Sequence, residues 1–238
     1  MAKTVFIPRR FCGPPDSGNG GYTCGLVAEA LGGASEVTLR MPVPIEQVMH
    51  VQFIDARHAH LKRGDDLVAE GARFEFELGD VPKVGFDQAS AVAKQSPAFT
   101  NHPFPTCFVC GPERAVGDGL RIFPGKVDAE ADGFEHLYAA PWIPDANLAD
   151  TSGRVRDEIL WAALDCPTGF AGGFPYEGKL VTGRLGAKLL SPARAGEKCT
   201  LVSWRTGVDG RKHHAAAVLL GENGDVHAQA RATWIKLQ

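Results

Sequence analysis

Apolar and polar residues alternate over much of the chain, and this alternation predicts strands for most of its length. Two dipeptides, Asp209-Gly210 and Asn223-Gly224, lie between such runs and are strong β-hairpin signals. The last four runs are therefore expected to form an antiparallel meander. The predicted strands are Ser35 to Pro42, Val48 to Ile54, Leu67 to Leu78, Leu180 to Leu190, Lys198 to Arg205, His213 to Gly221 and Val226 to Leu237.

Two segments have the pattern of helices. Gly20 to Leu31 is followed by Gly32-Gly33, which is a favourable helix end. Asp157 to Phe170 begins with two acidic residues, which suit a helix N-terminus, and its apolar residues face almost every direction. A helix of that kind is expected to be enclosed by other elements. Each helix precedes several predicted strands, so the order of elements is helix, then sheet, twice.

The repeated order indicates an internal duplication. Asp66 to Leu78 aligns without gaps with Asp225 to Leu237, and the two segments share Asp, Ala and the terminal Leu. Chance similarity of two strands is the alternative. The loop-like stretch Ser96 to Pro105 marks the boundary, which divides the chain into an N-terminal half, residues 1–100, and a C-terminal half, residues 101–238.

The composition is that of an ordinary folded protein with a balanced surface charge. The chain has 238 residues, 44% of them hydrophobic, and 25 Lys and Arg against 28 Asp and Glu give a formal net charge of −3. This balance argues against a nucleic-acid binder that works through a basic face. No apolar run approaches the roughly 20 residues that span a bilayer, and Met1 to Arg10 lacks the apolar region of a secretory signal. We therefore expect a cytoplasmic protein that binds neither nucleic acid nor membrane.

Three short motifs resemble a known family. Thr106 to Phe123 resembles the Cys-x-x-Cys-Gly and Gly-Leu sequence near the start of many bacterial thioesterases of the phenylacetate-pathway type. Ile159 to Gly169 is similar to their central helix, which combines apolar residues, a Leu-Asp pair and a small-residue end. Asn19-Gly20-Gly21 is similar to the His-Gly-Gly turn that opens this helix in the same families. The resemblance implies an α+β fold, the double hotdog, in which antiparallel β-sheet wraps two central helices.

Departures from the family pattern imply a single composite site. In the family, the turn and a helix carboxylate lie at a fixed spacing in each subunit, and the turn of one subunit faces the helix of the other. Here the position nine residues after Asn19 is Ala28, and the position nine residues before Asp165 is Arg156. Each half therefore keeps one part of the pattern. The resemblance implies that the Asn19 turn of the first half faces Asp165 of the second half.

These groups suit the cleavage of a thioester, which needs charge stabilisation at the carbonyl oxygen and an activated water or nucleophile. The N–H groups of Gly20 and Gly21 lie at a predicted helix N-terminus, where unpaired donors and the macrodipole favour an oxyanion. Asn19 is expected to cap the helix and to offer an amide donor. Asp165 lies in an apolar helix, where desolvation raises the pKa of a carboxyl and makes it a better base. A capped turn and a buried structural Asp are the alternatives.

Cys107 and Cys110 form a Cys-x-x-Cys pair, which is half of a zinc site. No second pair lies at a suitable spacing, and Cys166 continues an apolar helix, which favours a packing role. We therefore expect Cys107 and Cys110 to bind no metal and to form no disulfide, and we expect no cofactor. The residues that only the tertiary structure could bring to this pair are Cys12, Cys24 and His102.

The sequence thus predicts an acyl-CoA thioesterase-like hydrolase. The alternative is a non-catalytic double-hotdog protein that binds an acyl group or another small apolar ligand and has lost the chemistry. A hydratase or dehydratase on the same fold is disfavoured, because no Asp-x-x-x-x-His occurs at either turn. The expected partner is an acyl-CoA or a similar thioester, and self-association into a homo-oligomer is left open.

Overall fold

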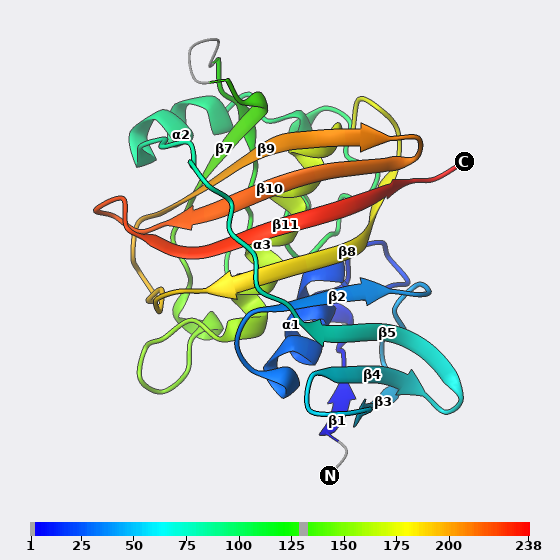
Figure 1. The fold of residues 1–238 in the computed structure, drawn as a ribbon. Coiled ribbons are helices and arrows are strands. Elements are labelled where there is room, and N and C mark those ends of the chain that lie inside the picture. Colours follow the sequence, from blue (N-terminus) through cyan, green and yellow to red (C-terminus); the bar gives the residue numbers. More distant parts are fainter. Residues whose placement is uncertain (1–2, 129–132) are drawn as a thin grey trace.

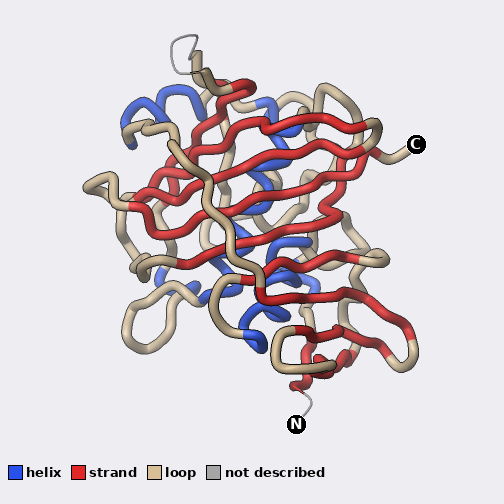
Figure 2. Tube along the Cα trace, viewed as in Figure 1, coloured by secondary structure: helices blue, strands red, loops and turns tan. Residues whose placement is uncertain are grey.

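The computed structural model describes residues 3–128 and 133–238 of the chain. Within these residues, eleven strands form one antiparallel sheet in the order β1-β3-β4-β5-β2-β8-β11-β10-β9-β7-β6 (Figures 1 and 2). None of the described helices is long and apolar enough to cross a membrane. The helices are α1 (Gly20–Leu31), α2 (Phe86–Ala93) and α3 (Asp157–Gly172). The strands are β1 (Lys3–Phe6), β2 (Ser35–Leu39), β3 (Val48–Phe53), β4 (His58–Arg63), β5 (Asp66–Arg73), β6 (Gly125–Lys126), β7 (Glu135–Trp142), β8 (Leu180–Leu189), β9 (Cys199–Asp209), β10 (Lys212–Leu220) and β11 (Val226–Lys236).

The same sequence of elements occurs on the two sides of the sheet's centre. One side contains β1, α1 and the strands β2 to β5, and the other contains β7, α3 and the strands β8 to β11. The two sides join through β2 and β8, which pair antiparallel from Ser35 opposite Ala187 to Thr38 opposite Arg184. One continuous sheet therefore wraps around two central helices. This confirms the predicted α+β class.

Helix α3 is buried along almost its whole length, as its apolar pattern predicts. Every residue from Ile159 to Gly172 is buried, and the helix packs against α1 and against β7 to β11. Its polar groups have partners: the Trp234 indole donates to Thr168 Oγ1 at 2.8 Å, and the Ser203 hydroxyl donates to the Pro167 carbonyl at 2.8 Å. Pairing of this kind offsets the cost of burying polar atoms.

Helices α1 and α3 cross in close contact because two glycines of α1 face α3. A Cβ at Gly21 would lie 2.4 Å from Asp165 Cβ, and a Cβ at Gly25 would lie 2.6 Å from Glu158 Cα. Two residues four apart lie on the same face of a helix, so both glycines point to the same partner. Any larger side chain at either position forces the two helices apart.

After β5 the chain leaves the ladder and crosses the outer face of the sheet, opposite to the central helices (Figure 1). The guanidinium of Arg231 lies 4.1 Å from the ring centroid of Phe74 and 5.5 Å from that of Phe76. Further along, Val84 joins a second apolar cluster with residues of β7, β9 and β10. The segment 74–85 thus covers apolar side chains that would otherwise face solvent.

Both predicted helices are confirmed: α1 has the predicted bounds, and α3 continues two residues further, to Gly172. The two predicted hairpins are also present: Asp209 ends β9 and Gly210 follows it in the turn to β10, and Asn223-Gly224 lies between β10 and β11. The dipeptides that favour tight turns were therefore reliable guides to strand pairing.

The predicted meander of the last four runs is wrong for one strand. β8 pairs with β11 and with β2, not with β9, because it is the strand through which the second half joins the first. The predicted strand from Leu67 to Leu78 ends at Arg73, where the chain turns to pack on Arg231. The sequence did not predict β1, β4, β6, β7 or α2, whose segments are short or lack a clear alternation.

We expect Gly25→Ala to lower the unfolding free energy by about 1–3 kcal/mol, which is the usual cost of overpacking. Helix propensity alone predicts the opposite sign, because Ala is favoured over Gly by up to about 1 kcal/mol inside a helix. Denaturant unfolding measures the difference. Gly207→Ala is the matched control, since a Cβ there meets no atom within 4 Å. An unchanged or increased stability of the Gly25 variant would contradict the close crossing.

Candidate active site

The start of α1, the middle of α3 and the strands β8 and β11 line an open cavity of about 590 Å³. Sites for small molecules typically have this size, a mostly apolar wall and a few convergent polar groups. Polar groups reach the cavity from both halves, with Asn19 and Gly20 from the first and Asp165 and Thr182 from the second. Among the apolar side chains of the wall are Phe104, Phe170, Phe174, Leu180 and Trp234.

The turn that opens α1 meets the carboxylate of α3 at this cavity. The Gly21 N–H donates a hydrogen bond of 2.9 Å to Asp165 Oδ2, across 144 residues of sequence. The turn is also tight on its other side, because a Cβ at Gly20 would lie 2.6 Å from Thr182 Cβ. The structure therefore brings together the turn and the carboxylate, which come from opposite halves. This proximity is what the composite-site hypothesis requires.

One expectation about the turn is wrong. The sequence predicts unpaired N–H groups at both Gly20 and Gly21, but the Gly21 N–H is bound to Asp165. The Gly20 N–H makes no hydrogen bond to any described residue, and Gly20 lines the cavity. The turn therefore offers one backbone donor to a ligand instead of two. The second donor orients the carboxylate.

Burial dominates the acidity of Asp165, which is only 1% exposed. It raises the pKa of the carboxyl from 3.8 to about 7, while hydrogen bonds from the Gly21 N–H and the Thr182 hydroxyl oppose the shift and the charge of Cys107 adds to it. Thr182 Oγ1 lies 2.9 Å from Oδ1 and 3.1 Å from Oδ2. The carboxyl is held in a fixed orientation and is partly ionised at neutral pH, as a general base must be.

Asn19 caps α1, as predicted, and its side chain is 2% exposed. Its Oδ1 accepts the Tyr22 N–H at 2.9 Å, which fixes the orientation of the amide. The Nδ2 group is consequently directed away from the helix, and it lies 3.9 Å from the sulfurs of both Cys107 and Cys166. Asn19 thus links the turn to a group of cysteines.

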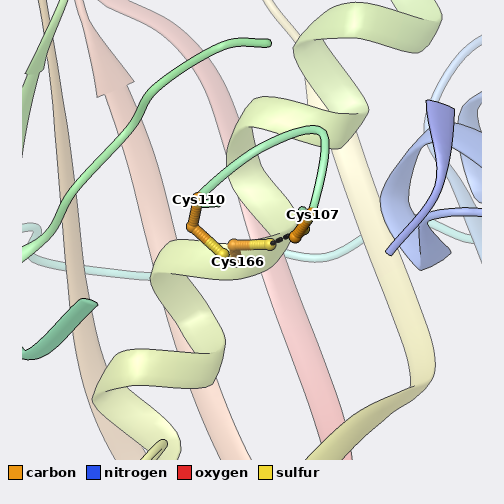
Figure 3. Close-up of side chains that lie close together, drawn as sticks. All are labelled: Cys107, Cys110 and Cys166. Atoms are coloured by element: carbon orange, nitrogen blue, oxygen red, sulfur yellow. Dashed lines mark hydrogen bonds between the residues drawn. The ribbon is translucent and has the colours of Figure 1, made fainter. Parts of the chain in front are cut away.

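Three cysteines gather at the cavity wall (Figure 3). Cys107 and Cys110 come from the loop that precedes β6, Cys166 comes from α3, and the three sulfurs lie within 4.8 Å of one another. The sulfurs of Cys107 and Cys166 are 3.7 Å apart. Hydrogen bonds from the thiols of Cys110 and Cys166, and from the N–H groups of Cys110 and Val109, lower the pKa of the Cys107 thiol well below its usual range.

Of the three residues that the tertiary structure could bring to the cysteine pair, only His102 contacts it. Cys24 lies elsewhere, with its thiol donating to the Val37 carbonyl, and Cys12 contacts the Thr106 carbonyl rather than the pair. His102 does reach the pair, since its Nε2 lies 3.1 Å from Cys110 Sγ. On the sequence alone Cys166 is interpreted as a packing residue and Thr182 as part of a strand. Their positions in the site depend on how the loop and β8 fold onto α3.

The fold has counterparts among solved structures, although no protein-family model matches the chain and no curated protein matches it in sequence. An acyl-CoA thioesterase II from Mycobacterium marinum matches with a TM-score of 0.65 and 9% identity over 99% of this chain and 93% of that one. A TesB protein from Mycobacterium avium subspecies paratuberculosis matches with a TM-score of 0.62 and 10% identity over 100% and 93%. A protein of unknown function with a hotdog fold, from Alicyclobacillus acidocaldarius, matches with a TM-score of 0.59 and 11% identity over 100% and 93%. These similarities show a double hotdog fold.

The raised pKa of Asp165 predicts a pH-dependent stability. In the folded protein the carboxyl titrates near pH 7, whereas in the unfolded chain it titrates near about 4. The native state therefore binds this proton more tightly, and its contribution to stability is largest below about pH 4 and is lost as the pH rises through about 7.

Asp165→Asn removes this titration and keeps the shape of the side chain. The wild type loses stability as the pH rises and the variant does not. We therefore expect the difference in unfolding free energy, variant minus wild type, to increase by on the order of a few kcal/mol from about pH 5 to about pH 8. Denaturant unfolding at each pH measures the two proteins side by side. A difference that does not change with pH would show that Asp165 is ionised throughout.

Proposed function

We propose that the chain is a thioester hydrolase that acts on an acyl-CoA or a similar acyl thioester. It would be a fused pair of hotdog halves, residues 1–100 and 101–238, with one composite site between them. The observation that carries the proposal is the position of Asp165, a buried carboxyl with a pKa of about 7 that is oriented by the turn of the other half and lines an apolar cavity. The similarity of fold to proteins described as thioesterases agrees with it.

In this mechanism Asp165 acts as a general base. Its carboxylate accepts a proton from a water molecule, the water oxygen forms a bond to the thioester carbon, and negative charge develops on the carbonyl oxygen. When the tetrahedral intermediate collapses, the carbon–sulfur bond breaks, and the proton held by Asp165 passes to the departing thiolate. Hydrogen bonds from the Gly21 N–H and the Thr182 hydroxyl keep the carboxylate in position throughout.

Charge on the carbonyl oxygen is stabilised at the start of α1. The Gly20 N–H is the free backbone donor of this turn within the described residues, and the positive end of the helix macrodipole lies at the same place. The Asn19 Nδ2 group faces the sulfurs of Cys107 and Cys166 instead, so it is not available to the same oxygen. A single backbone donor predicts a smaller stabilisation than two backbone N–H groups give.

The apolar wall of the cavity suits the acyl part of the substrate. Aromatic side chains such as Phe170 and Phe174 form a continuous surface, with ring centroids 5.1 Å apart. We infer a cytoplasmic location for the reaction, since all six cysteines are free thiols and a reducing compartment keeps them so. The near-neutral surface charge agrees with a partner that is a small molecule rather than a nucleic acid.

Loss of the base is the direct test. On an acyl-CoA that the wild type hydrolyses, found by screening short, long and aromatic acyl groups, Asp165→Asn should lower kcat by about 10²–10⁴-fold. Release of free thiol measures the rate. Asp157→Asn is the matched control on the same helix, because Asp157 pairs with Arg154 at its exposed start. Full activity of the Asp165 variant would defeat the mechanism.

The pH dependence of kcat provides a second test. Because the base must be deprotonated, kcat should rise with pH, reach half its maximum near pH 7 and level off above it. The rate of thiol release, measured from about pH 5 to about pH 9, gives the profile. A rate that is flat across this range, or one that falls with pH, would exclude Asp165 as the base.

A non-catalytic protein that binds acyl groups is the second candidate. The observation that favours it is the hydrogen bond between Gly21 and Asp165, which removes one donor from the turn and one acceptor site from the carboxylate. Calorimetric binding of acyl-CoAs without hydrolysis of any of them would support this candidate and reject the hydrolase.

A further inference from the structure

The loop that carries Cys107 and Cys110 turns tightly between the two cysteines. The Gly111 N–H donates a hydrogen bond of 2.9 Å to the Cys107 carbonyl. A Cβ at Gly111 would lie 2.5 Å from the carbonyl oxygens of Pro105 and Cys107, so only glycine fits this position. The turn therefore brings the two cysteine sulfurs to one point, where α3 adds a third (Figure 3).

From this arrangement we propose that Cys107, Cys110 and Cys166 bind one zinc ion. Zinc in proteins prefers thiolate ligands in tetrahedral geometry, and two Zn–S bonds of about 2.3 Å at that angle place their sulfurs about 3.8 Å apart. The sulfurs of Cys107 and Cys166 are 3.7 Å apart, and all three lie within 4.8 Å of one another. The three side chains need little movement to bind a common metal ion.

Nitrogen donors lie close to the sulfurs of the cluster. The Asn19 amide lies 3.9 Å from the sulfurs of Cys107 and Cys166. Cysteines that serve only as small apolar side chains need no such donors. Donors to sulfur stabilise thiolates, the form that binds metal, and they orient the ligands of metal sites.

His102 completes this set of donors and does not act as a fourth ligand. The Phe104 N–H donates to His102 Nδ1 at 3.0 Å, so in the neutral ring the proton lies on Nε2. Nε2 is 3.1 Å from Cys110 Sγ, and the histidine therefore donates a hydrogen bond to that sulfur. Zinc held by three protein ligands keeps one open coordination position. Because all three cysteines line the cavity, a water or a small ligand from the cavity would fill it.

This proposal reverses the expectation that Cys107 and Cys110 bind no metal. That expectation depended on the missing second pair of cysteines, and it treated Cys166 as a packing residue. The metal would connect the loop to α3 next to Asp165, and it would fix one wall of the cavity. Metal binding is measured without substrate, so the test of this proposal does not depend on the proposed hydrolysis.

The test measures metal in the full-length chain, purified under reducing conditions. Elemental analysis should find about one zinc per chain, and exchange for Co²⁺ should give thiolate-to-cobalt charge-transfer absorption with the intense d–d bands of a tetrahedral site. Cys166→Ser should weaken zinc binding by more than about 100-fold, whereas His102→Ala should weaken it by about 10–100-fold, as loss of a hydrogen bond to a ligand does. Competition with a chromogenic chelator gives both affinities.

Cys24→Ser is the matched control, since Cys24 is also fully buried and lies outside the cluster. It should bind zinc as the wild type does. If Cys166→Ser does not fold, Cys110→Ala and the cobalt spectrum of the wild type decide the matter instead. Absence of zinc and of the cobalt bands from the reduced wild type would overturn the proposal. Fewer than six titratable thiols in the denatured, unreduced protein would reveal a disulfide among the free cysteines described here and would also overturn it.

Discussion

The hydrogen bond between the Gly21 N–H and the Asp165 carboxylate is the contact on which the site depends. It forms because the two central helices approach until the backbone of one touches a side chain of the other, which the missing Cβ of Gly21 allows. A helix N-terminus stabilises a carboxylate, whereas an apolar interior destabilises it. The balance leaves a carboxyl with a pKa of about 7. The contact thus fixes, together with Thr182, the orientation of a carboxyl whose acidity is set mainly by burial.

The two halves share their fold and differ in this contact. The position in α1 that corresponds to Asp165 is Ala28, which is buried, and α3 begins with Asp157 and Glu158 where α1 begins with two glycines. The close crossing is kept by Gly21 and Gly25 of α1 alone. The start of α1 supplies the turn of this contact, and the middle of α3 supplies the carboxylate.

Local patterns predicted the parts of this structure that depend on neighbouring residues. The bounds of α1 follow from its N-cap Asn19 and the glycines after Leu31, and the two hairpins follow from Asp-Gly and Asn-Gly turns. The meeting of the turn with Asp165 was expected from a resemblance of short motifs. Contacts between distant segments carried no such signal: β8 lies between β2 and β11, and this alone places Thr182 beside Asp165. The residues next to Cys166 in the sequence are those of an ordinary buried helix. Its proximity to Cys107 and Cys110 depends on how the loop before β6 folds onto α3.

The pairing of β2 with β8 has a consequence for the biosynthesis of the chain. Its partners, such as Thr38 and Arg184, are 146 residues apart, so the centre of the sheet closes only after β8 has left the ribosome. Until then the first half presents β2 as an edge with unpaired backbone N–H and C=O groups. Such an edge can pair with the same strand of another nascent chain. Pairing with β8 covers this edge and so removes the strand with which a neighbouring chain could pair.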